Sequence, residues 1–141
     1  MRITVLVLAV GVLLFSCAKK EVYPEAPSHG GGVRIAFGLL PEGKPVFFTF
    51  YLREKGINYF VIRMRDHVES YFDACIKCYP RKRGYAYDGD RLICRACDVR
   101  YPLDKLKDGI GSCYPIKLAG KVEAGFYLID ADALRDGDKY F

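Results

Sequence analysis

The sequence predicts a mainly β fold: a small antiparallel β domain with two Cys-x-x-Cys turns and little helix. Short runs of β-branched and aromatic residues are separated by segments that contain Pro and Gly. An Asp-Gly pair at residues 88–89, the strongest short hairpin signal, stands between two such runs. With 141 residues, the chain has room for one such domain and a leader segment.

The first three runs of β-forming residues lie at residues 33–37, 46–52 and 58–65. Because short turn-forming segments separate them, we expect three strands in hairpin succession. The third run alternates between two sets of residues, Phe60, Ile62 and Met64 against Val61, Arg63 and Arg65. A period of two with charges on one side predicts a half-buried strand whose outer face is partly charged.

The second half of the chain carries weaker signals, apart from its hairpin. Residues 85–93 are expected to form that hairpin and to place Cys94 at its far end. Residues 103–108 predict a helical turn. A strand is expected at residues 124–129, followed by a turn or short helix at residues 131–134.

The first 16 residues predict a cleaved export signal. Arg2 is followed by a short apolar run that ends in Leu14-Phe15-Ser16-Cys17. The run is too short to span about 30 Å of hydrocarbon comfortably, since a permanent helix takes about 20 apolar residues. The final four residues resemble a bacterial lipobox, in which the cysteine is lipidated and begins the mature protein. An uncleaved anchor helix is the alternative, and either places the domain outside the cytoplasm, at the cell envelope.

Residues 17–32 are expected to form the lipid anchor and a flexible tether. They carry charges, two prolines and the run Gly30-Gly31-Gly32, with little to bury. Two or more acyl chains on Cys17 would give stable membrane attachment. The folded domain is therefore predicted to cover residues 33–141.

Five cysteines follow the tether and form two Cys-x-x-Cys pairs and a single residue: Cys75 and Cys78, Cys94 and Cys97, and Cys113. Fifteen residues separate each group from the next. Each short turn aims two thiolates at one point, and the intervening hairpin brings the turns together, so the spacing predicts a four-cysteine metal site. Zinc, mononuclear iron and iron-sulfur clusters all accept tetrahedral sulfur ligands, and spacing alone does not separate them.

Other cysteine chemistries fit the sequence less well. A c-type haem needs His after the second cysteine, where Tyr79 and Asp98 stand instead. A Rieske centre needs two histidines, and the chain has only His29, in the tether, and His67, which remains a spare candidate ligand. Disulfides suit an exported domain, and the odd number of cysteines does not decide against them, because a four-cysteine metal site also leaves one cysteine over. Thiol-disulfide exchange is less favoured because the surroundings are rich in β-forming residues.

The charge pattern excludes some function classes. The formal net charge of +5 is spread along the chain, and the dense basic run Arg81-Lys82-Arg83 is interpreted as a solvated loop rather than a phosphate or partner site. No nucleic-acid-binding module is present, so no nucleic acid is expected as a partner.

Asp66, His67 and Glu69 form the one cluster with catalytic residue types, and solvated turn residues are the favoured interpretation. An enzymatic activity is therefore not expected.

Four motifs together carry a family resemblance. The chain has an Ala-Cys-x-x-Cys pair ending at Cys78, a Gly-Tyr pair at Gly84, a second Cys-x-x-Cys pair ending at Cys97, and Gly111-Ser112-Cys113-Tyr114-Pro115-Ile116. This set resembles the membrane iron-sulfur-containing FtrD-like family over about residues 33–141. The chain departs from the family pattern at Tyr114, usually Asn, and at Lys117, often Pro. Many members carry the domain behind transmembrane helices near iron-permease genes, where this chain has a lipobox.

The resemblance implies an iron-sulfur cluster or mononuclear iron, with zinc as the alternative, held by four of five candidate ligands: Cys75, Cys78, Cys94, Cys97 and Cys113. It implies electron transfer or iron handling beside a membrane redox or iron-transport protein. Gly111, Ser112 and Pro115 suit a tight loop against a cluster, with backbone N–H groups donating to sulfur. The competing hypothesis is an interaction domain stabilised by structural zinc or disulfides.

Overall fold

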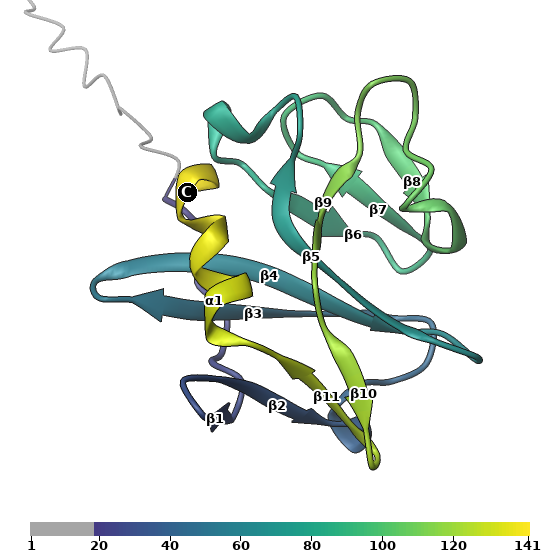
Figure 1. Ribbon diagram of the computed structural model, residues 1–141. Coiled ribbons are helices and arrows are strands. Elements are labelled where there is room, and N and C mark those ends of the chain that lie inside the picture. The colour runs from purple at the N-terminus through teal and green to yellow at the C-terminus, as the bar shows by residue number, and fades with distance from the viewer. Residues whose placement is uncertain (1–18) are drawn as a thin grey trace, which may run out of the picture.

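The computed structural model describes residues 19–141, which form antiparallel β-sheets joined by short helices (Figure 1). The prediction of a mainly β fold is confirmed. The predicted leader and Cys17 lie outside the described residues. None of the helices in residues 19–141 is both long enough and apolar enough to cross a membrane.

Three sheets carry the described strands. The first, which we call the lower sheet, contains β1 (Ser28–His29), β2 (Gly32–Ala36), β11 (Phe126–Ile129) and β10 (Lys121–Glu123), in that order. The central sheet contains β3 (Pro45–Leu52), β4 (Lys55–Arg63), β5 (Val68–Cys75) and β9 (Pro115–Leu118). The cysteine sheet contains β6 (Tyr85–Tyr87), β7 (Arg91–Cys94) and β8 (Arg100–Pro102).

The helices are short and connect or cover the sheets. They are the 3-10 helices η1 (Phe37–Leu39), η2 (Tyr79–Arg81), η3 (Leu103–Lys105) and η4 (Asp136–Tyr140), and the α-helix α1 (Ala131–Arg135). The predicted helical turn after residue 103 and the short helix after residue 131 are both present. The predicted last strand is present as β11.

The prediction of three strands in hairpin succession is wrong for the first strand. β3 and β4 form a hairpin, but β2 pairs with β11 from the far end of the chain. In that pairing Val33 lies opposite Ile129 and Ile35 opposite Tyr127, and all four side chains are buried. A pairing between segments so distant in sequence depends on this shared burial, which local patterns do not report.

The sequence pattern did not indicate β5, which leads directly into Cys75. Its residue Ser70 follows the charged residue Glu69, yet it is fully buried. The Ser70 hydroxyl donates to the carbonyl of Leu118 at 2.8 Å and lies 2.9 Å from the hydroxyl of Tyr127. Because these bonds satisfy the buried hydroxyl, a polar residue is accommodated in the middle of the central sheet.

The central sheet is buried on both faces, so the prediction that the third strand is half-buried, with a partly charged outer face, is also wrong. Along β4, Ile57, Tyr59 and Val61 belong to a core shared with the lower sheet and the C-terminus. The alternate residues Phe60 and Ile62 belong to a second core shared with the cysteine sheet. Successive side chains of a strand point to opposite faces, which lets one strand serve two cores.

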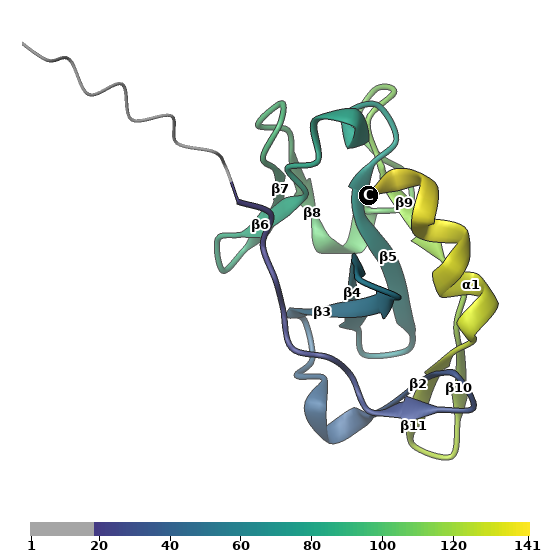
Figure 2. The same ribbon diagram turned by 90° about the vertical axis from the view of Figure 1, so that its left-hand side faces the viewer.

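The described part of the predicted tether lies along the edge of the central sheet (Figure 2). The Tyr23 N–H donates to the Thr49 hydroxyl at 2.9 Å, and the Thr49 N–H donates to the Pro24 carbonyl at 3.1 Å. The Asn58 side-chain amide donates to the Glu21 carbonyl at 2.7 Å. Sequence composition predicted flexibility here, whereas these bonds attach the segment to the domain.

We predict that Gly32→Ala destabilises the fold by about 1 to 3 kcal/mol. A Cβ at position 32 would lie 2.2 Å from the carbonyl oxygen of Ile129, a backbone atom that can move only by separating β2 from β11. The measurement is the free energy of unfolding in urea. Gly38→Ala is the matched control, since a Cβ there meets nothing within 4 Å, and a change of less than about 1 kcal/mol is expected. Equal effects of the two substitutions would contradict the prediction.

Candidate metal centre

Each Cys-x-x-Cys pair begins at the end of a strand and continues through a tight turn. Cys75 ends β5, and the Cys78 N–H donates back to the Cys75 carbonyl at 3.0 Å. Cys94 ends β7, and the Asp98 N–H donates to its carbonyl at 2.8 Å, while the Cys94 N–H donates to Val99 at 2.9 Å. Strand ends thus fix the first cysteine of each pair, and backbone bonds fold the rest of each turn.

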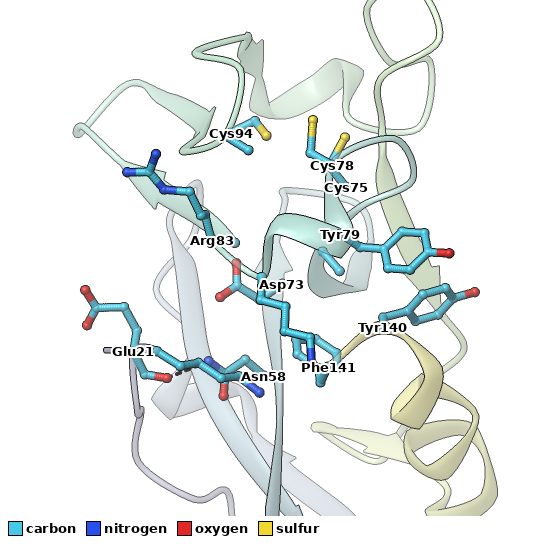
Figure 3. A pocket seen from close by; sticks show the side chains of 15 residues that line it. Glu21, Asn58, Asp73, Cys75, Cys78, Tyr79, Arg83, Cys94, Tyr140 and Phe141 are labelled. Atoms are coloured by element: carbon cyan, nitrogen blue, oxygen red, sulfur yellow. Dashed lines mark hydrogen bonds between the residues drawn. The ribbon is translucent and has the colours of Figure 1, made fainter. Parts of the chain in front are cut away.

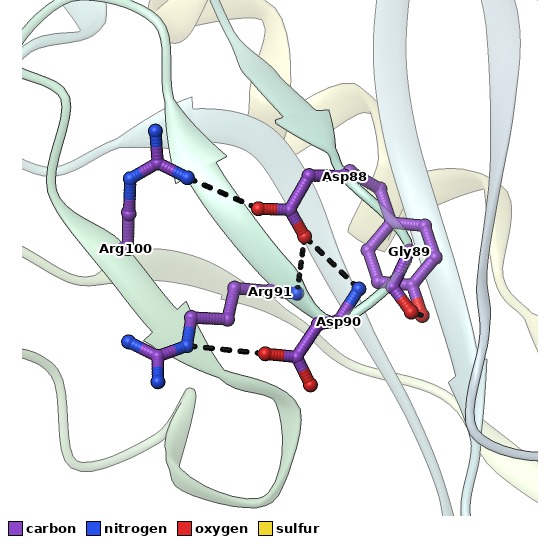
Figure 4. A network of polar contacts seen from close by, with 6 residues as sticks. Asp88, Gly89, Asp90, Arg91 and Arg100 are labelled. Carbon is purple, nitrogen blue, oxygen red and sulfur yellow. Dashed lines mark hydrogen bonds and ion pairs between the residues drawn. The ribbon is translucent and has the colours of Figure 1, made fainter.

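The predicted hairpin is confirmed and is held by one carboxylate (Figure 4). One oxygen of Asp88 accepts the N–H groups of Asp90 at 2.9 Å and Arg91 at 2.7 Å, and the other accepts Arg100 at 3.0 Å. The backbone N–H groups of Arg91 and Asp90 lower the pKa of Asp88. Gly89 has a φ of +102°, which a glycine adopts without strain. This turn sets the register that places Cys94 at the end of β7.

The buried carboxylate of Asp73 joins the cysteine sheet to the central sheet. It lies two residues before Cys75 and accepts the Tyr85 N–H at 2.6 Å, while the Arg95 N–H donates to the Gly84 carbonyl at 3.0 Å. Burial raises the pKa of Asp73 to about 7, and the Tyr85 N–H and the charge of Arg95 oppose the rise. Figure 3 shows Asp73 in the pocket that Cys75, Cys78 and Cys94 also line.

The loop that carries Cys113 is fastened to the first Cys-x-x-Cys turn. Ile110 and Cys113 exchange two backbone hydrogen bonds, at 2.8 and 3.1 Å, and the Ile76 N–H donates to the Tyr114 carbonyl at 3.1 Å. Pro115, which begins β9, lies opposite Cys75 in the central sheet. The tight loop expected around Cys113 is therefore present.

These segments bring all five predicted ligands together. Two groups of three cysteines form, in each of which the sulfur atoms lie within 4.8 Å of one another: Cys75, Cys78 and Cys94, and Cys78, Cys97 and Cys113. Cys78 belongs to both groups and so stands at the centre of the set. All five are free thiols in the structure. A shared centre, rather than separate pairs, favours metal binding over a disulfide framework.

The cysteine set runs from the interior to the surface. Cys75 and Cys94 are only 2% and 1% exposed, Cys78 and Cys113 are half-buried, and Cys97 is exposed. Burial raises the pKa of Cys94 to about 11 and raises the pKa values of Cys78 and Cys113, with the neighbouring thiols adding to each rise. Crowded thiols resist becoming thiolates together, and a bound cation offsets that repulsion.

Backbone N–H groups already favour negative sulfur at two positions. At Cys75 burial acts to raise the pKa, but the N–H groups of Lys77 and Cys78 lower it below its usual value. At Cys97 burial again opposes the shift, and the Val99 N–H lowers the pKa. N–H donors around sulfur are the usual means by which proteins stabilise and tune thiolate-bound metals.

Two buried tyrosines provide further donors that the sequence analysis missed. Tyr85 and Tyr101 are fully buried, and their hydroxyls have no hydrogen-bond partner among residues 19–141. Burial first, and the charge of Cys75 second, raise the pKa of both hydroxyls, and both tyrosines pack in the second core together with Cys75 and Cys94. Unpartnered buried donors beside an all-thiol set fit a bound centre that presents sulfur acceptors. Aromatic residues reveal such a role only once the fold places them.

The other candidates lie away from the cysteine set. His67, the spare ligand, is exposed at the β4–β5 turn, where its Nδ1 lies 2.6 Å from Asp66. Glu69 accepts the Tyr71 hydroxyl at 2.6 Å. His29 is exposed on β1. None of these residues joins the two groups of three, so within residues 19–141 the candidate ligand set consists of thiols alone.

Comparison with known protein families identifies the domain. Residues 40–141 match the model of a family described as membrane iron-sulfur containing protein FtrD-like. The chain belongs to this family. The resemblance predicted from the four cysteine-containing and glycine-containing motifs is thereby confirmed, and the FtrD-like match includes all five clustered cysteines. No curated protein and no solved structure gave a significant match.

We predict that Gly84→Ala loosens the cysteine set. A Cβ at position 84 would lie 2.5 Å from a carboxylate oxygen of Asp73, and the residue has a φ of +61°. Gly89→Ala is the matched control, because its φ is also positive but a Cβ there meets nothing within 4 Å. Both variants bear a backbone strain of about 1 kcal/mol, and Gly84→Ala loses about 1 to 3 kcal/mol more. The free energy of unfolding in urea and the rate of thiol labelling in the metal-free protein measure this difference. Equal stabilities and equal labelling rates in the two variants would disprove the prediction.

Proposed function

We propose that the protein is a lipid-anchored iron-sulfur protein of the cell envelope that transfers single electrons to or from a membrane partner. The observation that carries this proposal is the convergence of five thiols, two of them deeply buried, on a shared centre at Cys78. The family description, which names membrane and iron-sulfur, supports the choice of cofactor. A structural zinc site is the alternative that the experiments below separate.

The thiols and the groups around them suit this role. An iron-sulfur or thiolate-bound iron centre, when bound, supplies a site that accepts and releases one electron. Cys75, Cys78, Cys94, Cys97 and Cys113 are the residues that would hold it. Backbone N–H groups donate to the sulfur atoms of Cys75 and Cys97, and the Tyr85 and Tyr101 hydroxyls are buried in the core that contains Cys75 and Cys94. Donors stabilise the more negative, reduced state and so raise the reduction potential.

Exposure at one end favours electron transfer over a purely structural site. Cys97 is exposed and Cys113 half-buried, whereas Cys75 and Cys94 are buried against the aromatic second core. A redox partner that docks over Cys97 would approach the centre closely, while the buried end limits access of water. The lipobox at Cys17 predicts the membrane as the place where that partner, a redox or iron-transport protein, is met.

The proposal predicts iron with acid-labile sulfide and visible absorption in protein purified without oxygen. Cys78→Ser removes the thiol shared by both groups and is expected to lower bound iron to less than about a tenth of the parent value. Cys17→Ser is the control, because it makes the same chemical change outside the described domain and should leave the iron content unaltered. Iron without sulfide would indicate a mononuclear centre, and colourless protein that holds zinc would sink the electron-transfer proposal.

Tyr101→Phe is expected to lower the reduction potential by roughly 20 to 60 mV, because it deletes one neutral donor near sulfur. Tyr59→Phe is the control: its hydroxyl is also buried without a partner among the described residues, but it lies in the other core. Redox titration followed by visible absorption measures both. An unchanged potential in Tyr101→Phe, with iron content intact, would show that its hydroxyl does not donate to the centre.

The predicted anchor is tested by mass spectrometry of the protein extracted from membranes. The mature chain should begin at Cys17 and carry the added mass of acyl chains, since stable attachment takes two or more. Cys17→Ser should carry none. A mature N-terminus elsewhere, or an unmodified Cys17, would contradict the lipid anchor while leaving the metal centre unaffected.

A further inference from the structure

A basic hollow lies beside the two Cys-x-x-Cys turns. It has a volume of about 480 Å³, and six cationic residues and one acidic residue line it: Lys19, Lys20, Arg81, Lys82, Arg83, Arg95 and Glu21. Three segments contribute, namely the start of the described chain, the segment after Cys78 and the residue after Cys94. This concentration of positive charge produces a positive electrostatic potential in the hollow, which attracts anions.

Few of these charges are neutralised within the protein. Arg95 lies 3.1 Å from Glu21 in an ion pair, and Arg81 donates to the Ala96 carbonyl at 3.0 Å. By contrast, the side chains of Lys19, Lys82 and Arg83 have neither an ion-pair partner nor a hydrogen bond within residues 19–141. These three cations leave the hollow with an excess of positive charge.

Backbone and side-chain contacts fix the segments that line the hollow. Lys82 follows η2 with a φ of +52°, and its N–H donates to the Tyr79 carbonyl at 2.9 Å. Lys20 donates to the Gly56 carbonyl and lies over the ring of Phe141, 4.4 Å from its centroid. Figure 3 shows the side chains of Arg83 and Glu21 on the same side of the neighbouring pocket. The cations are therefore displayed by ordered segments.

The hollow lies close to the predicted lipid anchor, and this position favours an anionic lipid over other anionic partners. Lys19 is two residues from Cys17, and two residues of fully extended chain span at most about 7 Å. A lipid on Cys17 would therefore hold this wall of the hollow at the membrane surface. Clusters of Lys and Arg next to a membrane anchor bind anionic lipid headgroups.

We infer that this hollow binds the phosphate-bearing headgroup of an anionic lipid in the membrane that holds the Cys17 anchor. The inference rests on the proposed lipid anchor and deepens it. Arg81 to Arg83 follow Cys78, and Arg95 follows Cys94, so the contact turns both Cys-x-x-Cys loops toward the membrane. The interpretation of Arg81-Lys82-Arg83 as a merely solvated loop is replaced by a binding role.

The test uses the mature chain without its lipid, produced by placing the Cys17→Ser variant behind an ordinary cleaved signal. The substitution lies outside residues 19–141, which contain both cores. It is mixed with vesicles of phosphatidylcholine alone, or of phosphatidylcholine with about one third phosphatidylglycerol, and bound protein is measured by flotation. Binding is expected only with phosphatidylglycerol and is lost in high salt. The double variant Lys82→Ser/Arg83→Ser should bind about tenfold or more weakly.

Lys105→Ser/Lys107→Ser is the matched control, because it removes two cations that do not line the hollow and should change binding less than about twofold. Absence of flotation with phosphatidylglycerol would overturn the inference and leave an acidic protein surface as the partner of the hollow. Equal weakening in both double variants would also overturn it, since net charge alone would then explain binding. Circular dichroism and iron content check that each variant is folded. The protein used carries no lipid, and flotation reports only binding to vesicles, so the result does not depend on whether Cys17 is lipidated or which cofactor is bound.

Discussion

The burial of the central sheet on both faces is the constraint on which the rest of the structure depends. β4 contributes alternate side chains to two cores, so neither the lower sheet nor the cysteine sheet can shift without disturbing the other. β5 and β9 extend from this sheet into the candidate metal centre, at Cys75 and at the loop of Cys113. Segments nearly forty residues apart along the chain thereby deliver their thiols to one place.

The same low-dielectric interior that fixes the cysteines makes their chemistry costly. Buried thiols resist ionisation, and the Tyr85 and Tyr101 hydroxyls lack partners within the described part of the chain. Both features are unfavourable in an apolar core and become favourable around a metal with sulfur ligands. A bound metal would therefore stabilise the domain, and its removal would lower the free energy of unfolding.

The exposed features that bear on function gather at the end of the domain that carries the cysteines. The half-buried and exposed cysteines, the basic hollow and the start of the described chain all lie around the two Cys-x-x-Cys turns. A lipid at Cys17 and a headgroup in the hollow would hold this end at the membrane. Electron exchange would then occur where a membrane partner is within reach.

Short-range physics determined what the sequence revealed by itself. The Asp-Gly turn, the cysteine spacing and the run of apolar residues before Cys17 are local patterns, and the first two agree with the structure and with membership in the FtrD-like family. Each depends on residues that are close in sequence, so backbone geometry and residue type suffice to predict it.

Tertiary structure alone decided the pairing of β2 with β11, the burial of Ser70 in β5, the attachment of the segment around Tyr23, and the burial of two tyrosine hydroxyls in the core that contains Cys75 and Cys94. A polar residue such as Ser70 is typical of a surface until a distant carbonyl satisfies it. The basic hollow likewise joins cations from three separate segments. These features depend on contacts between residues far apart in sequence, and such contacts exist only after the two cores have formed.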